Sequence, residues 1–273
     1  MTRFGPAVSL IVAEKLGVDQ RLQARAGDAK VDAMRLGLRW RLDLASNHNR
    51  RLYALGSYDA PLLRTILTSI EQHDVFLDVG ANVGLVAIPV AKRLRELGVG
   101  KVIAAEPSRD VVSQLVTNVA LNGLEQWLDI KTVALGASPG SMTLRAGKVE
   151  ADSGLRSLAG DGQAIAQVDV TTIDDLCSRL PSPPTIAKID VEGWEVEVLS
   201  GATRLLSEFP PRLIIAEVIE EHLNRAGSSA RDLHGILTGA GYQGNWIRHR
   251  GLQLIEDVRD HLSINIAYTR RAN

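Results

Sequence analysis

The chain has 273 residues, of which 45% are hydrophobic and 23% are charged, and its formal net charge is −1. This composition is typical of a globular protein and excludes a coiled coil, a collagen-like repeat and a wholly disordered chain. Because the net charge is close to zero, nothing attracts the whole chain to nucleic acid or to an anionic membrane. Neither is an expected partner.

The cysteine content and the hydropathy pattern predict a cytoplasmic protein. Cys177 is the single cysteine, so no intrachain disulfide can form, which is typical of a reducing compartment. No segment approaches the run of about 18 apolar residues that a membrane span requires.

Residues 1–70 predict an N-terminal cap of helices and a strand, which covers the cofactor or mediates a homodimer contact. Apolar residues between 10 and 18 predict a first helix. Strict alternation of apolar and polar residues over 36–44 predicts a strand with one buried face. The polar segment 46–49 is typical of a turn, and a helix is expected over 60–70.

From residue 71 to residue 273 the pattern predicts one α/β domain with a doubly wound, mostly parallel sheet, because apolar strands alternate with helical patterns. The segment 146–166 interrupts the alternation and is rich in small and polar residues, so we expect a surface insertion that acts as a substrate lid. A closing hairpin is expected over 242–268. The predicted strands are 75–79, 102–105, 128–134, 141–145, 168–171, 186–190, 213–218 and 263–268, and the predicted helices are 85–97, 108–122, 195–206 and 232–240.

The strongest motif is Asp-Val-Gly-Ala-Asn-Val-Gly at 78–84, which directly follows a predicted strand and opens a predicted helix. Glycines in such a loop allow a tight turn and close approach of a ligand to the backbone. A dinucleotide fingerprint would require glycine at positions 82 and 85, which are Asn and Leu here. The Asp78 carboxylate would repel a phosphate and instead suits a ligand with an ammonium group.

An acidic residue, Glu106, ends the second strand of the pattern, where a carboxylate accepts both hydroxyls of a ribose. The loop and Glu106 together require a ligand with a ribose, a cationic group and no phosphate. S-adenosylmethionine meets this requirement.

Four stretches in order give the chain a family resemblance: 76–84, 105–108, 170–176, and 188–193 with Glu195. Together they resemble the FkbM-type methyltransferases of the class I S-adenosylmethionine-dependent fold. The resemblance implies a Rossmann-like, seven-stranded sheet with one antiparallel strand, and methyl transfer to a hydroxyl of a carbohydrate or related small molecule. It also places Trp127 near the adenine. The cofactor-binding residues that it implies are Tyr58, Asp78, Gly80, Ala81, Asn82, Gly84, Glu106, Ala134 and Asp190.

Removing the proton of an alcohol requires a general base or a metal ion. We expect the catalytic groups Asp190, Glu217 and His222 at the carboxyl ends of the fourth and fifth strands. Asp190 and Glu217 are the predicted ligands of a Mg²⁺ ion, and Asp190 or His222 acting as a base without metal is the alternative.

Three further residues near the fourth strand have expected roles. Glu192 and Trp194 are the predicted substrate contacts, with helix capping and core packing as their alternatives. Lys188 lies inside a strand predicted to be buried and is expected to pair with a carboxylate across the sheet, with a position near the substrate as the alternative.

Three competing functions remain open at this stage. An NAD(P)-dependent oxidoreductase would keep Glu106 but lacks two of its glycines. A non-catalytic cofactor-binding protein would bind without turnover. A nucleic-acid methyltransferase would be expected to carry an aromatic-proline motif after the fourth strand, where Asp-Val-Glu-Gly stands at 190–193.

Overall fold

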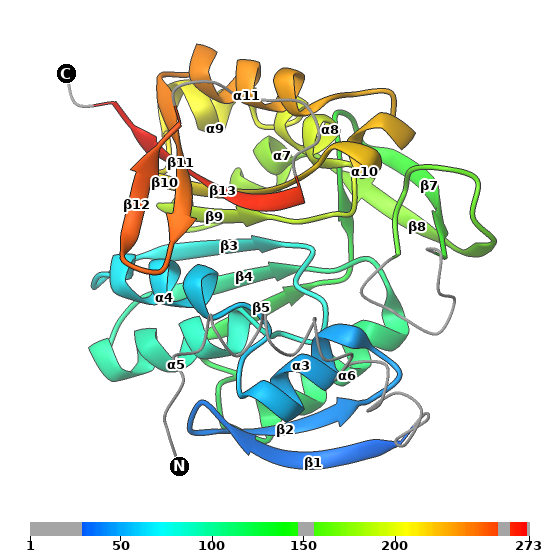
Figure 1. Ribbon diagram of the computed structural model, residues 1–273, viewed down its shortest axis with the longest axis vertical. Helices are drawn as coiled ribbons and strands as arrows, with labels where there is room; N and C mark the ends of the chain where they lie inside the picture. The colour runs from blue at the N-terminus through cyan, green and yellow to red at the C-terminus, as the bar shows by residue number, and fades with distance from the viewer. Residues whose placement is uncertain (1–28, 147–155, 256–262, 272–273) are drawn as a thin grey trace.

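The computed structural model describes residues 29–146, 156–255 and 263–271, and its main feature is one eight-stranded sheet between two layers of helices (Figure 1). Five neighbouring strands are parallel, and β13 is antiparallel to both of its neighbours. In spatial order the strands are β12 (Gly251–Leu254), β11 (Tyr242–Arg248), β13 (Ser263–Arg270), β10 (Leu213–Ile219), β9 (Ile186–Ile189), β3 (Val75–Val79), β4 (Lys101–Ala105) and β5 (Leu128–Lys131).

This arrangement confirms the predicted doubly wound, mostly parallel α/β fold. Seven of the strands form the expected sheet, which extends in space from β5 at one edge to β11 and includes β13. Within it, β13 is antiparallel to its neighbours. The eighth strand, β12, pairs with the outer edge of β11 and comes from the closing hairpin. The sheet is therefore one strand wider than expected.

Side chains of β3 alternate between the two faces of the sheet and contribute to two separate hydrophobic clusters. Phe76 belongs to one cluster, whereas Leu77 and Val79 belong to the other. This alternation buries the strand on both faces, as in parallel sheets generally. The helices of the first face are α4 (Ala60–Ser69), α5 (Ala87–Leu97) and α6 (Arg109–Ala120), and those of the second are α7 (Ile173–Cys177), α8 (Glu195–Ser200), α9 (Thr203–Glu208), α10 (Glu220–Arg225) and α11 (Ala230–Gly239).

The strand order changes direction between β3 and β9. From β3 the chain adds β4 and β5 on one side, and β9 and β10 then extend the sheet on the other side. Loops that leave two such neighbouring strands diverge, which opens a crevice at their carboxyl ends. This switch point positions the candidate site.

The N-terminal part begins with a hairpin of β1 (Lys30–Arg35) and β2 (Leu38–Asp43). The predicted strand over 36–44 was partly wrong, since Leu36 and Gly37 form the two-residue turn with φ of 58° and 67°. The predicted turn at 46–49 was also wrong, because α3 (Asn47–Leu55) begins there and ends at the left-handed Gly56. The helix expected over 60–70 is confirmed as α4, and the helix expected over 10–18 lies outside the described residues.

The described part of the expected cap shares its core with the main sheet. Trp40 and Leu42 of β2 belong to the same hydrophobic cluster as Phe76 of β3 and Ile88 of α5. The side-chain amide of Asn118 on α6 links β2 to the loop after β3. Its oxygen accepts a hydrogen bond from the Arg41 backbone amide at 2.8 Å, and its nitrogen donates one to the Val83 carbonyl at 3.2 Å.

A second, three-stranded sheet follows β5 and contains β6 (Ala134–Leu135), β7 (Gly140–Arg145) and β8 (Ala164–Thr171). The strand predicted over 128–134 is therefore two short strands in different sheets. β8 begins four residues before the expected 168. Of the predicted lid at 146–166, residues 147–155 lie outside the described residues, and Ser157 pairs through its backbone with Arg145.

The helix predicted over 195–206 is divided into α8 and α9 at Gly201. A Cβ atom at Gly201 would lie 2.1 Å from the Gly136 carbonyl oxygen, so the backbone passes too close to the loop after β6 for any side chain. Among the described helices, none has the length and apolar character needed to cross a bilayer.

We expect Asn118→Ala to lower the free energy of unfolding by about 2 kcal/mol, because it leaves the buried Val83 carbonyl and the partly buried Arg41 amide without their partner. Urea denaturation measures the change. Ser113→Ala, at an exposed position of the same helix, is the matched control and should cost less than about 0.5 kcal/mol. Equal stabilities of the two variants would contradict a tying role for Asn118.

Candidate functional site

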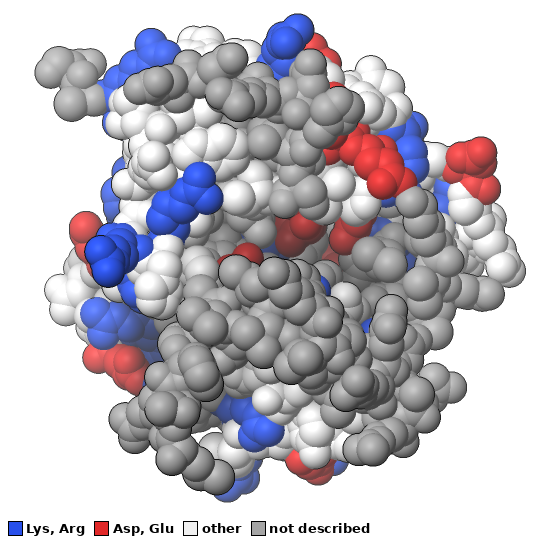
Figure 2. Space-filling model, viewed as in Figure 1, with Lys and Arg blue, Asp and Glu red and all other residues white. Residues whose placement is uncertain are grey.

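A pocket of about 840 Å³ opens at the carboxyl ends of β3, β4 and β9, where the strand order changes. The space-filling view shows acidic side chains in the hollow near the centre of this face (Figure 2). The residues predicted for the site that line the pocket are Tyr58, Asp78, Gly80, Ala81, Asn82, Glu106, Ala134, Asp190, Glu192 and Trp194.

The loop after β3 forms one wall of the pocket and is held by backbone contacts. The amides of Gly80 and Ala81 both donate to the Ala105 carbonyl, at 3.0 and 3.1 Å. Gly80 has a φ of 77°, and a Cβ atom there would lie 1.8 Å from the Asp190 carbonyl oxygen. Only glycine fits this contact, which brings the ends of β3 and β9 together.

Glu106 follows β4 and is fixed by two backbone amides. Its Oε2 accepts from Asn82 and its Oε1 from Ser108, each at 3.0 Å. The side chain is buried, which raises its pKa to about 7 despite these hydrogen bonds. Each carboxylate oxygen still has a free lone pair, so the pair of oxygens can accept two further donors from the pocket.

Lys188 of β9 is buried between two carboxylates at the base of the pocket, which confirms its expected pairing across the sheet. Its Nζ lies 3.1 Å from Asp190 Oδ2 and 3.5 Å from Asp78 Oδ1. Burial alone would lower the pKa of Lys188, but Asp190 and Asp78 raise it well above its ordinary value. Burial raises the pKa of Asp78 to about 6, against the opposing effect of Lys188. Neither Asp78 oxygen accepts a well-formed hydrogen bond from the described residues.

Arg156 is a lining residue that the sequence analysis missed. It follows the segment 147–155 and reaches α6, where its guanidinium donates to Asp110 Oδ1 at 2.6 Å and to the Ser108 hydroxyl. This ion pair, chiefly through its hydrogen bond, lowers the pKa of Asp110 to about 2. No local pattern marks Arg156, because its partners lie more than 40 residues away in the sequence.

Two residues that we expected around the cofactor do not line the pocket. A Cβ atom at Gly84 would lie 2.6 Å from Leu115 and 2.7 Å from Ile88, so helix packing accounts for this glycine. Trp127 packs against the hydrophobic cluster of the first face. The other cofactor-binding residues implied by the resemblance remain predictions.

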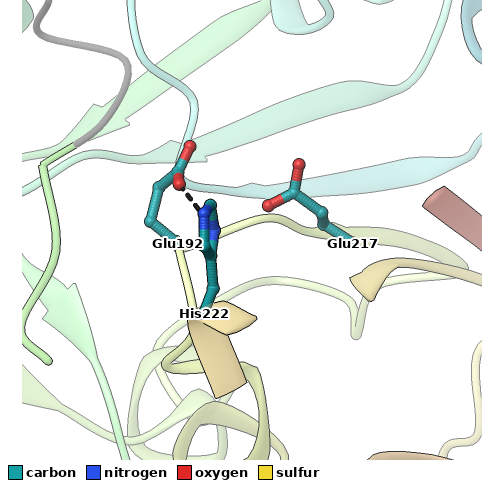
Figure 3. A group of neighbouring side chains, drawn as sticks. All are labelled: Glu192, Glu217 and His222. Carbon is teal, nitrogen blue, oxygen red and sulfur yellow. Dashed lines mark ion pairs between the residues drawn. The ribbon is translucent and has the colours of Figure 1, made fainter. Parts of the chain in front are cut away.

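Glu217, one of the two expected metal ligands, lies in a cluster of possible metal ligands that the prediction did not contain. Glu217 lies with Glu192 and His222, and one potential ligand atom from each lies within 4.8 Å of the others (Figure 3). His222 Nδ1 is 2.9 Å from Glu192 Oε2. Asp190 is not part of this group and pairs with Lys188. The Mg²⁺ site expected at Asp190 and Glu217 stays a prediction, and the cluster of three is another group of possible ligands among the described residues, which contains Glu217 and not Asp190.

Comparison with known proteins places this chain in a family. Residues 78–243 match the family model described as the methyltransferase FkbM domain. This match covers more than half of the chain. The chain belongs to the FkbM methyltransferase family.

This chain is similar to individual members of the family and to other methyltransferases. It is 27% identical over 182 residues to the hexuronic acid methyltransferase AglP of Haloferax volcanii, a match that spans 66% of this chain and 67% of AglP. A solved FkbM methyltransferase from Methylobacillus flagellatus has 19% identity and a TM-score of 0.47, over 74% of this chain but only 45% of its own. TYW2 of M. jannaschii in complex with AdoMet has 13% identity and a TM-score of 0.45, over 89% and 88% of the two chains.

The region of this chain that matches the family model begins at Asp78 and ends in β11. It therefore contains the whole loop after β3, Glu106 and the cluster of Glu192, Glu217 and His222. The hairpin β1–β2 and helices α3 and α4 precede it. Tyr58, which lines the pocket from the segment between these helices, is thus a contribution from outside the matched region. Burial raises the pKa of Tyr58 well above its ordinary value, so its hydroxyl keeps its proton.

We expect Lys188→Met to lower the free energy of unfolding by about 3 kcal/mol at pH 8, because the buried Asp78 and the partly buried Asp190 then lack their cation. In the folded protein the pKa of Asp78 is already raised above its ordinary value, although Lys188 opposes the rise. Removing Lys188 raises this pKa further. Over a wider pH range, the folded protein then holds a proton on Asp78 that the unfolded chain has lost. Stability in that range falls as pH rises, and the deficit should therefore be smaller at about pH 5.

Denaturation at both pH values tests this prediction. Lys92→Met removes a partly exposed lysine that pairs with Glu96 on α5 and serves as the control. It should cost less than about 1 kcal/mol at either pH. A Lys188 deficit that is equal at the two pH values, or larger at low pH, would contradict the role of the two carboxylates.

Proposed function

We propose that this protein is an S-adenosylmethionine-dependent O-methyltransferase whose acceptor is a hydroxyl of a saccharide or glycoside. The observation that carries the proposal is the placement of two buried carboxylates, Asp78 and Glu106, at adjacent strand ends of one pocket. The family membership supports methyl transfer as the reaction, and the residues of the pocket support S-adenosylmethionine as the cofactor.

The residues of the pocket fit S-adenosylmethionine. Asp78 is a fully buried carboxylate without a well-formed hydrogen bond, which matches the ammonium of the methionine part. Glu106 is held by two amides so that both oxygens are fixed in place, which matches the two hydroxyls of a ribose. Ala134 and Leu135 provide an apolar wall beyond Glu106 that suits the adenine.

S-adenosylmethionine supplies, when bound, an electrophilic methyl group for transfer to oxygen. Asp78 and Glu106 orient it from two sides, and Tyr58 contributes a protonated hydroxyl to the same pocket. Asp190 removes the proton of the acceptor hydroxyl. Because Lys188 engages Oδ2 of Asp190, we assign the proton to Oδ1. Lys188 thus holds the base in position.

Glu192 and Trp194 support the acceptor assignment, because both follow Asp190 and line the pocket. A tryptophan face and a carboxylate are suitable contacts for the apolar face and the hydroxyls of a sugar ring. The relative AglP is a hexuronic acid methyltransferase, which favours a hexuronic acid glycoside as the acceptor. A cytoplasmic location, a homodimer and the absence of nucleic-acid partners stay predictions.

We expect Asp78→Asn and Glu106→Gln each to weaken binding of S-adenosylhomocysteine by at least about tenfold. With Asp78 at a pKa of about 6 and Glu106 at about 7, both must lose a proton to accept the ligand, so affinity of the wild type should rise between about pH 6 and pH 8. Calorimetry measures both effects. The Glu125→Gln control changes an exposed carboxylate outside the pocket and should bind normally, whereas full affinity in both pocket variants would refute the cofactor assignment.

We expect transfer of labelled methyl from S-adenosylmethionine to hexuronic acid glycosides, and a loss of at least about a hundredfold in kcat for Asp190→Asn. The exposed Asp169→Asn is the control. The position of the label tests the acceptor atom, because a methyl ether survives alkali and a methyl ester of the carboxylate does not. Alkali-labile product would contradict a hydroxyl acceptor, and label in no saccharide would contradict the saccharide class.

A further inference from the structure

The cluster of Glu192, Glu217 and His222 is drawn from three elements at the carboxyl edge of the sheet. Glu192 lies in the turn after β9, Glu217 near the end of β10, and His222 on α10 (Figure 3). Ligand atoms that share a metal ion at about 2.1 Å lie on the order of 3 to 4 Å from one another. The three side chains approach this spacing, with His222 Nδ1 2.9 Å from Glu192 Oε2 and all three ligand atoms within 4.8 Å.

A second observation points to a missing cation at this place. Glu217 Oε2 is completely buried and has no hydrogen-bond partner among the described residues. Figure 3 shows its carboxylate turned toward the other two side chains. Across the sheet, the register pairs Glu217 with Asn265, whose Oδ1 is also buried without a partner. A buried carboxylate oxygen without a donor is costly, so a ligand that satisfies it would stabilise the site.

The nearby protein charges do not supply this cation. Glu217 lies near three further carboxylates, Asp190, Glu192 and Glu195, and near the cation of Lys188. Lys188 is already shared by Asp78 and Asp190. An ion pair of His222 with Glu192 accounts for those two residues alone and leaves the Glu217 oxygen unsatisfied.

We propose that Glu192, Glu217 and His222 bind one divalent transition-metal ion. Two carboxylates and one imidazole are a mixed oxygen and nitrogen set, which suits Mn²⁺ or Zn²⁺, whereas Mg²⁺ prefers oxygen ligands alone. The ion therefore differs from the Mg²⁺ expected from the sequence, both in its ligands and in its chemical class.

Three protein ligands leave coordination positions open, and Glu192 places the ion beside the pocket. This role rests on the proposed function. Oxygen atoms of the acceptor sugar take the open positions, so the ion holds the acceptor next to Asp190. A hexuronic acid brings a negative charge toward the carboxylates of Asp190, Glu192 and Glu217. The positive charge of the ion reduces the resulting repulsion.

The test is a titration of the full chain, first stripped with a chelator, with MnCl₂ or ZnCl₂, followed by calorimetry and by the electron paramagnetic resonance of Mn²⁺. We expect one ion per chain, with tighter binding of Zn²⁺ and Mn²⁺ than of Mg²⁺. Glu217→Gln and His222→Ala should each weaken binding by at least about tenfold. Glu221→Gln, which changes the exposed carboxylate next to His222, is the matched control and should bind normally.

Thermal unfolding separates a lost ligand from a lost fold. Without metal, Glu217→Gln should be at least as stable as the wild type, because it removes an uncompensated buried carboxylate. With metal, the wild type should gain stability and Glu217→Gln should not. No binding to the wild type, binding that Mg²⁺ dominates, or unchanged binding in Glu217→Gln and His222→Ala would overturn the proposal.

Metal binding and the proposed function fail in distinguishable ways. The titration needs neither S-adenosylmethionine nor an acceptor, so failure of every sugar as an acceptor would leave a measured metal site intact. If a hexuronic acid glycoside is methylated, its KM should rise at least about tenfold in Glu217→Gln, while S-adenosylhomocysteine still binds normally. An unchanged KM would overturn the acceptor role of the ion.

Discussion

The buried ammonium of Lys188 is the constraint on which the site depends. In the parallel register Lys188 lies beside Asp78, and Asp190 follows two positions later, directly after the end of β9. Residues two apart on a strand point to the same face, so one cation can serve both carboxylates. This pairing places a base candidate from β9 and an ammonium-binding carboxylate from β3 at the same point. Without the cation, the buried Asp78 carboxylate would be left uncompensated.

Two close backbone contacts then fix the loops around that point. Gly80 lies against the Asp190 carbonyl, and a Cβ atom at Gly193 would lie 2.3 Å from the His222 carbonyl oxygen. The turn after β9 is therefore packed between the β3 loop on one side and α10 on the other. Glu192 lies within this turn with a φ of 57°, an uncommon conformation for a residue with a side chain. The same packing that positions Asp190 for the pocket brings Glu192 to His222.

The sequence predicted those parts of the fold and the site that depend on local pattern. Alternation of buried strands and helices identified the sheet, and the motif at 78–84 identified the pocket, because both arise from neighbouring residues. Errors occurred where a distant contact or a turn conformation decides the structure. Leu36 continues an apolar alternation but takes a left-handed turn conformation, and Gly201 interrupts a regular helical pattern because Gly136 lies against it.

The same distinction explains which site residues the sequence missed. Asp190 and Glu217 end neighbouring strands, so their partnership was a reasonable expectation. In the structure Asp190 pairs with Lys188, whereas Glu217 lies with His222. These neighbours depend on the face of the sheet that each side chain occupies and on the path of α10, which no local pattern specifies. Arg156 was missed for a similar reason, because its partners on α6 are brought near by the second sheet.

Charge balance connects the two ends of the pocket. At the end near β3, Lys188 compensates part of the negative charge of Asp78 and Asp190, and under the proposed function the ammonium of the cofactor completes that balance. At the end near β10, the carboxylates of Glu192 and Glu217, when both are ionised, carry more negative charge than one His222 imidazolium can compensate. Under the proposed function, a neutral hydroxyl acceptor does not change this excess, and a hexuronic acid increases it. The proposed metal ion would compensate the excess, and it would thereby reduce the repulsion of an anionic sugar that approaches Asp190.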